Sequence, residues 1–97
     1  MTPRLERPRL ARKARLQWDQ HEQKYLLLYP ERGLLLNEAA AAVVALCDGR
    51  HDPSRIAFVV AARFATLDPD EVLRGTFSFL ERLDQLGLLE HGERSLG

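Results

Sequence analysis

The sequence has only one cysteine, Cys47, and no long apolar run. A single cysteine cannot form an internal disulfide, which excludes a small domain held together by disulfide bonds. No apolar stretch approaches the roughly 20 residues that a membrane-spanning helix needs. The first ten residues lack the apolar core of a secretory signal. We therefore expect a cytoplasmic protein.

The motifs of common enzyme families are also missing. The sequence contains no GxSxG, GxGxxG, P-loop or HExxH pattern. The three histidines, His21, His51 and His91, do not have the spacing of zinc ligands and are typical of surface positions. Cys47 lies in an apolar segment, where a small buried hydrophobic residue explains it better than a nucleophile. We expect no catalytic residue, no metal site and no cofactor.

Positive charge is concentrated at the N-terminus, although the net charge of the 97 residues is zero. Six basic residues against Glu6 give residues 1–16 a net charge of +5, which leaves −5 for the remainder. Such an arm could bind nucleic acid or an acidic partner, but docking on its own acidic domain is the simplest interpretation. Because two prolines lie amid these charges, we expect an extended basic arm over residues 1–9. A single domain over 10–90 and a frayed tail over 91–97 account for the rest.

Alternation of apolar and polar residues predicts three short strands. Leu16 and Trp18 share one face of the first strand, and we place both in the core. Residues 24–29, KYLLLY, carry leucines on both faces, so both faces of the second strand are at least partly covered. A tight PERG turn, in which we expect Gly33 to supply a positive φ, leads to a third strand over Leu34–Leu36. Sequential strands with short connections form an antiparallel meander.

Three helices follow, each preceded by a residue of N-cap type: Asn37, Asp52 and Asp68. Glu71 lies three residues after Asp68, where it can complete a capping box. Gly49 and Gly87 are expected to end the first and third helices. Gly75 interrupts the third helix, either at a tolerated cost of ~1 kcal/mol or because a backbone approaches closely there. Strands followed by helices predict an α+β domain like a winged helix-turn-helix protein with its strands moved to the front.

The outer edge of the third strand is a candidate binding surface. An uncovered strand edge presents unpaired N–H and C=O groups that can accept an added strand. An apolar stripe on the third helix can form the other wall of a groove beside it. The residues expected to contact a peptide there are Leu34, Leu35, Leu36, Val72, Leu73, Thr76, Phe77 and Leu80. Each is also explained as a core residue; this interpretation is favoured for Leu36 and Phe77, whereas Leu34, Leu35 and Leu73 fit both.

A DNA-binding winged-helix regulator is the alternative from another class, because the helix order and the basic arm suit it. It would need a basic recognition helix. The second helix offers only Arg55 and Arg63. The third offers two arginines against four carboxylates. A peptide-binding module is therefore the better hypothesis.

The sequence resembles the PqqD family, the small proteins of pyrroloquinoline quinone (PQQ) biosynthesis. The resemblance extends from Arg7 to Leu89. Its most specific parts are Leu28-Tyr29-Pro30-Glu31 with Gly33, Leu36-Asn37-Glu38 and Cys47-Asp48-Gly49. Ala39 is a minor departure, since family members often carry Thr there.

The resemblance implies a RiPP recognition element, a non-catalytic chaperone that binds the precursor peptide PqqA and presents it to the radical S-adenosylmethionine enzyme PqqE. The iron–sulfur clusters of that system belong to PqqE. The peptide lies as an added strand along the third strand and against the third helix, which here means Leu34–Leu36 and the face around Val72–Leu80. No nucleic acid and no membrane are implied as partners. A homodimer is an alternative use of the same edge, because an open strand can also pair with a second copy.

Overall fold

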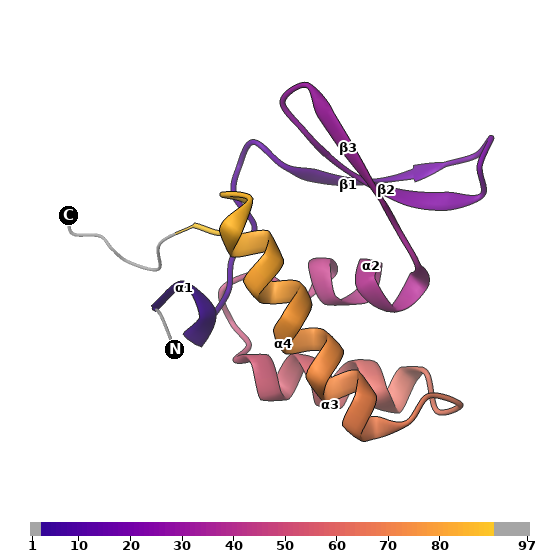
Figure 1. Cartoon of the computed structure of the whole chain (residues 1–97), viewed down its shortest axis with the longest axis vertical. Coiled ribbons are helices and arrows are strands. Elements are labelled where there is room, and N and C mark those ends of the chain that lie inside the picture. Colours follow the sequence, from indigo (N-terminus) through magenta and orange to yellow (C-terminus); the bar gives the residue numbers. More distant parts are fainter. Residues whose placement is uncertain (1–2, 91–97) are drawn as a thin grey trace.

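The computed structural model describes residues 3–90 and shows a small sheet beside a group of helices (Figure 1). The elements, in chain order, are α1 (Pro3–Glu6), β1 (Arg15–Asp19), β2 (Lys24–Tyr29), β3 (Arg32–Leu36), α2 (Glu38–Ala45), α3 (Pro53–Arg63) and α4 (Pro69–Gln85). The strands form one antiparallel sheet in the order β1-β2-β3. The predicted fold, a three-stranded antiparallel meander followed by three helices, is confirmed, with α1 as an addition before it.

The register of the sheet assigns each leucine to a face. Leu16 pairs with Leu27 and Leu27 with Leu34, so these three lie on one face, with Leu27 fully buried against the helices. Leu35 pairs with Leu26 on the opposite face, and its side chain is 55% exposed. Trp18 was placed in the core by its alternation, and this is wrong. It is 43% exposed at the end of the sheet, with its ring edge-on to Tyr25 at 5.0 Å between centroids.

The turn between β2 and β3 uses a different residue from the one predicted. Tyr29 pairs with Arg32, so only Pro30 and Glu31 remain in the loop. Glu31 has the positive φ, at 65°, whereas Gly33 lies within β3 opposite Leu28. A proline followed by a residue with positive φ is typical of a type II turn. Proline therefore fixes the turn, and Glu31 adopts the left-handed conformation that was expected of the glycine.

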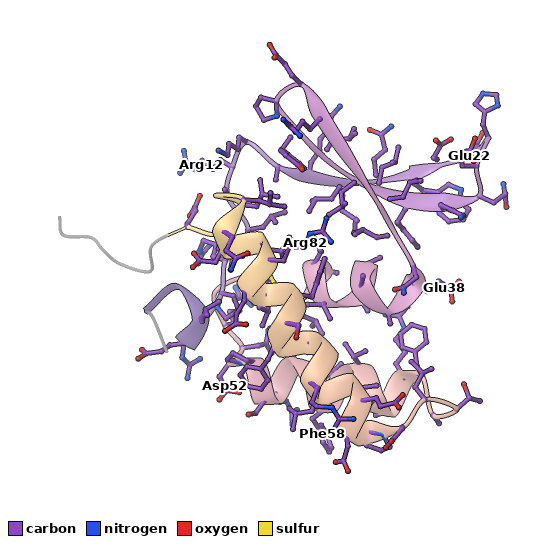
Figure 2. All side chains as sticks on the ribbon, viewed as in Figure 1. Arg12, Glu22, Glu38, Asp52, Phe58 and Arg82 are labelled. Carbon is purple, nitrogen blue, oxygen red and sulfur yellow. The ribbon has the colours of Figure 1, made fainter. Side chains whose placement is uncertain are left out.

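The three predicted N-caps are confirmed. Asn37 Oδ1 accepts from the N–H of Ala40 at 2.7 Å. Asp52, which is labelled at the start of α3 in Figure 2, accepts from Arg55 N–H at 2.8 Å, and Asp68 accepts from Asp70 N–H at 3.1 Å. These bonds satisfy amides in the first helical turn, which have no partner inside the helix. Within the described part of the chain, Glu71 makes no reciprocal bond to Asp68, so the predicted capping box is not formed.

Gly87 ends α4 as predicted. With φ at 74°, it follows the C-cap Leu86. The N–H of Leu88 donates to Leu83 O at 2.8 Å, and the N–H of Gly87 donates to Asp84 O at 3.0 Å. This pair of bonds is the Schellman motif. It turns the chain so that Leu88 is fully buried beside the helix that it has just left.

Gly49 does not end α2, which stops at Ala45 with Leu46 as its C-cap. Gly49 has φ at 83° and lies against the N-terminal segment. A Cβ at this position would lie 2.7 Å from a guanidinium nitrogen of Arg9. Glycine is favoured here because the backbone conformation is left-handed. The Arg9 guanidinium is the end of a flexible side chain and could move aside, so space alone does not require glycine.

The N-terminal segment is not an extended arm. Residues 3–6 form helix α1, and Leu5 and Pro8 are buried. Residues 8–11 then run between the segment after α2 and the segment after α4. Four backbone hydrogen bonds hold them there: Gly49 N to Pro8 O (2.9 Å), Leu10 N to Cys47 O (2.9 Å), Ala11 N to Leu88 O (2.7 Å) and Glu90 N to Arg9 O (2.8 Å). The predicted tail over 91–97 lies outside the described residues.

Candidate functional site

The outer edge of β3 is open. β3 pairs with β2 on one side, and no other segment within residues 3–90 pairs with its second side. The N-terminal segment binds elsewhere, to residues 47–49 and 88–90. The backbone groups on the free side of β3 are therefore available for hydrogen bonds to an added strand.

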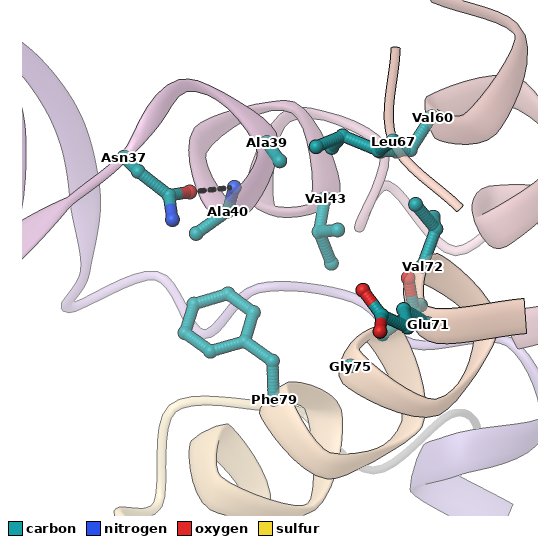
Figure 3. A pocket seen from close by; sticks show the side chains of 11 residues that line it. Asn37, Ala39, Ala40, Val43, Val60, Leu67, Glu71, Val72, Gly75 and Phe79 are labelled. Atoms are coloured by element: carbon teal, nitrogen blue, oxygen red, sulfur yellow. Dashed lines mark hydrogen bonds between the residues drawn. The ribbon is translucent and has the colours of Figure 1, made fainter. Parts of the chain in front are cut away.

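A groove of about 320 Å³ begins where β3 ends, between α2 and α4 (Figure 3). Its lining is mostly hydrocarbon: Asn37, Ala39, Ala40, Val43, Val60, Leu67, Glu71, Val72, Gly75, Thr76 and Phe79. Asn37 stands at the junction of β3 and α2, and Phe79 of α4 faces it and Ala40 across the groove (Figure 3). An open strand edge thus leads directly into an apolar groove. Extended peptides use this combination by pairing their backbone with the strand and burying alternate side chains.

The three leucines expected on the strand side do not line this groove. Leu36 is buried in the core, and Leu34 is half-buried against it. Leu35 and Leu36 border a separate hollow on the other side of Asn37, together with Trp18 and Tyr25. Because these side chains point to the two faces of the sheet, β3 offers a guest its backbone rather than its leucines.

The helix residues expected in the site divide into two groups. Val72 and Thr76 line the groove. Leu73, Phe77 and Leu80 do not; Leu80 is fully buried in the core, Phe77 is half-buried and Leu73 is 40% exposed.

Several groove residues were not predicted from the sequence, above all Glu71, Gly75 and Phe79 on α4. The signal was present in the helical spacing. Val72, Thr76 and Phe79 recur every three or four residues and define one stripe, whereas Leu73, Phe77 and Leu80 define the neighbouring one. The angle at which α4 crosses α2 decides which stripe faces the groove. This angle depends on both helices and cannot be predicted from the sequence of one.

Gly75 forms an unobstructed part of the α4 wall. A Cβ built on it meets no atom within 4 Å, so nothing in the described structure requires glycine for space. Its φ is not positive, so the backbone does not require glycine either. The absence of a side chain leaves the groove wider at this point. A guest backbone that occupied this space would make the close approach to Gly75 that the sequence suggested as one explanation for the glycine.

The groove carries one charged residue, Glu71, among its eleven lining residues. Among the other titratable groups of the described residues, two have clearly shifted pKa values. Burial raises the pKa of the Cys47 thiol to about 12, with a smaller contribution from the charge of Asp48. Desolvation acts to raise the pKa of Asp48, but hydrogen bonds from Arg50 N–H and His51 and the charge of His51 outweigh it and lower that pKa. Neither group lines the groove.

Within residues 3–90, no group of three or more His, Cys, Asp or Glu is placed to hold a metal ion. No helix in the same range is long and apolar enough to cross a membrane. The arginines of α3 that a DNA-binding helix would need, Arg55 and Arg63, lie over Phe58 and Phe64 of the same segment, at 5.4 and 5.9 Å from the ring centroids.

A further hollow, of about 310 Å³, borders the other outer strand, β1. It is lined by Leu16, Tyr25, Glu38, Ala41, Ala42, Ala45, Arg63 and Phe64. Both a carboxylate and a guanidinium belong to this lining, so it is more polar than the groove beside β3. The sheet therefore has two open edges with different surroundings.

Comparison with known proteins identifies the family. Residues 24–89 match the family model described as Coenzyme PQQ synthesis protein D (PqqD). A protein named PqqA binding protein from Methylococcus capsulatus is 40% identical over 58 residues, which is 58% of this chain and 62% of that relative. One of the same name from Rhodopseudomonas palustris (strain TIE-1) is 39% identical over 83 residues, 86% of this chain and 80% of that relative.

A solved structure shares the fold and much of the sequence. It is the solution structure of the PqqD part of Methylobacterium extorquens PqqCD, described as a functional and stand-alone RiPP recognition element. The TM-score is 0.71 at 37% identity, covering 86% of this chain and 87% of that one. The family match over most of the chain and the 39% identity of a relative covered to 80% agree with this shared fold. The chain belongs to the PqqD family.

Proposed function

We propose that this protein is a non-catalytic peptide chaperone of PQQ biosynthesis. It binds the precursor peptide PqqA as an added strand along the open edge of β3 and presents it to the radical S-adenosylmethionine enzyme PqqE. The observation that carries the proposal is the open edge of β3 together with an apolar groove between α2 and α4 whose lining begins at Asn37, the residue that follows β3. Relatives named PqqA binding protein support the choice of guest.

Two kinds of contact would contribute to the affinity: backbone hydrogen bonds to β3 and burial of guest side chains in the groove. Hydrogen bonds to the β3 backbone contribute about 1 kcal/mol each, and they accept almost any guest sequence. Alternate guest side chains enter the groove, where apolar burial contributes roughly 25 cal/mol per Å². Selectivity therefore comes from the α2 and α4 walls, with Ala40 and Phe79 on opposite sides.

Presentation follows from the shape of the site. A guest that completes the sheet leaves its own far edge and its flanking residues outside the groove. The partner enzyme can act on those flanking residues while the bound segment stays in place. In this proposal the chain supplies position alone, and PqqE supplies the chemistry.

Calorimetric titration with a synthetic PqqA peptide tests the binding mode. Backbone pairing uses N–H groups that alternate along the guest. Peptides N-methylated at alternate positions of one parity should therefore lose at least tenfold in affinity, while the other parity loses much less. Equal effects at both parities would contradict strand addition. The variant Leu35→Pro should also bind more weakly, because proline removes a backbone donor from β3; unchanged affinity in a folded variant would count against this edge.

A coupled assay tests presentation. PqqA modification by reduced PqqE should be faster when this protein is added at saturating concentration. A Gly75→Leu variant, whose side chain would fill the groove, should not accelerate it. Equal rates with and without the wild-type protein would remove the presentation step while leaving peptide binding intact.

We also propose that the same edge pairs two copies at high concentration. A homodimer formed in this way would compete with the guest for the same backbone groups. Light scattering over a dilution series should show dimers that the PqqA peptide dissociates. Dimers that persist at saturating peptide would show that the copies associate through another surface.

A further inference from the structure

We infer that Glu71 is a specificity-determining residue that selects a guest peptide carrying a lysine or arginine side chain at one fixed place. The inference rests on the proposed function and adds a rule for which peptides the groove accepts. It concerns the end of the groove farthest from Phe79.

Glu71 is the charged member of an otherwise neutral lining. Figure 3 shows its carboxylate beside Val72 and Gly75, directed into the groove. Hydrocarbon from Val43, Val60 and Val72 surrounds this space. Glu71 is exposed in the free protein. A guest that enters the groove would cover this carboxylate and lower the polarity around it, which strengthens its attraction to a guest cation.

Among residues 3–90, no partner neutralises this carboxylate. Glu71 does not bond back to Asp68, because that cap accepts from Asp70 N–H instead. Arg74, the nearest basic residue along α4, is exposed, does not line the groove and forms no ion pair with Glu71. Glu71 lies in the first turn of α4, where the helix dipole favours negative charge. Within residues 3–90 the carboxylate therefore has no basic partner and is available to a guest.

The spacing along α4 places the guest cation. Glu71 and Phe79 are eight residues apart, which is about 12 Å along a helix axis. An extended guest covers that distance in about four residues, and residues four apart point to the same face of a strand. The expected guest therefore carries an apolar residue that packs on Phe79 and a lysine or arginine four residues away, beyond the end of β3 at Asn37.

Calorimetry with the synthetic PqqA peptide and the variant Glu71→Gln tests this rule. At low ionic strength the affinity should fall about five- to tenfold. Asp70→Asn is the matched control, because it removes a carboxylate from the neighbouring residue, which is exposed like Glu71 but does not line the groove. Asp70→Asn should lower the affinity for the peptide less than twofold. The difference in peptide affinity between Glu71→Gln and Asp70→Asn should become smaller at about 0.5 M salt, because salt screens the charge.

The peptide supplies the second half of the test. Each lysine and arginine of PqqA is replaced in turn by norleucine. One replacement should weaken binding to the wild-type protein and have little effect on Glu71→Gln, because the two changes remove the same contact. The inference is overturned if Glu71→Gln binds as tightly as the wild type, or if no replacement shows this coupling. In both cases continued sensitivity to N-methylation would leave the proposed function standing, whereas a wild-type protein that does not bind the peptide would remove both.

Discussion

The two outer strands of the sheet, β1 and β3, are both open but differ in what lies beside them. The edge of β3 continues into a groove with apolar walls and one carboxylate, Glu71. The edge of β1 borders a hollow that contains Glu38 and Arg63 and is lined in part by the fully packed face of α2. Because both edges are open, we propose that the helix wall beside an edge decides which edge takes a peptide. Beside β3 that wall is α4, whose residues Val72, Thr76 and Phe79 line the groove.

The comparison requires that the chain's own N-terminal segment stay away from both edges. The variant Leu10→Pro removes the N–H that donates to Cys47 O and should lower the free energy of unfolding by about 2 kcal/mol or more. Urea denaturation measures the change. Arg12→Pro is the control, because Arg12 occupies the second position of the turn closed by Ala14 N to Ala11 O, where proline is favoured. If both variants lost the same free energy of unfolding, the hydrogen bond from Leu10 N–H would not be what fixes the segment.

Filling one space at a time separates the two edges directly. Gly75→Leu places a side chain in the groove beside β3, and Ala45→Leu places one in the hollow beside β1. The first should weaken binding of the PqqA peptide at least tenfold, about 1.4 kcal/mol, and the second should leave it unchanged. Both positions are exposed, so both variants should fold. Titration calorimetry gives the affinities. A larger loss of affinity in Ala45→Leu than in Gly75→Leu would indicate that the peptide binds beside β1.

Cys47 lies just beyond α2 and lines neither the groove beside β3 nor the hollow beside β1. Its buried thiol therefore reports on stability without affecting either edge. Its pKa is raised to about 12 by burial, above the ordinary value of 9.0. The stabilisation that this shift represents is complete below about pH 9 and is lost as the pH rises toward 12. We expect the free energy of unfolding to fall by about 1 kcal/mol between pH 8 and 10, and this loss should be absent in Cys47→Ala.

The smallest effect concerns the glycine of the groove wall. Gly75→Ala should raise the free energy of unfolding by up to about 1 kcal/mol, because alanine favours the helix and its Cβ meets no atom within 4 Å. Thermal unfolding followed by circular dichroism measures this gain. Affinity for the PqqA peptide should fall at the same time, though less than with leucine. A stabilised variant with unchanged affinity would show that the guest stays clear of this position.

Local chemistry could be predicted from the sequence where one residue decides the outcome. The caps at Asn37, Asp52 and Asp68 and the Schellman turn at Gly87 follow from a few neighbouring residues. Each depends on hydrogen bonds within about one turn of the chain.

Features that depend on distant contacts could not be predicted. Trp18 is exposed because it lies at the end of the strand, beyond the cover of the helices. The N-terminal segment is fixed by partners near residues 48 and 89. Phe79 rather than Phe77 faces the groove because of the way α4 crosses α2. In each case the deciding quantity is the packing angle or pairing of elements far apart in sequence.

Hydrogen exchange of the backbone amides, followed by NMR with and without the PqqA peptide, tests the central claim most directly. In the free protein, the β3 amides that face away from β2 should exchange quickly, as should the outer amides of β1. Saturation with the peptide should protect the outer amides of β3 at least tenfold and leave those of β1 unchanged. Protection of β1, or no new protection at either edge, would contradict the account.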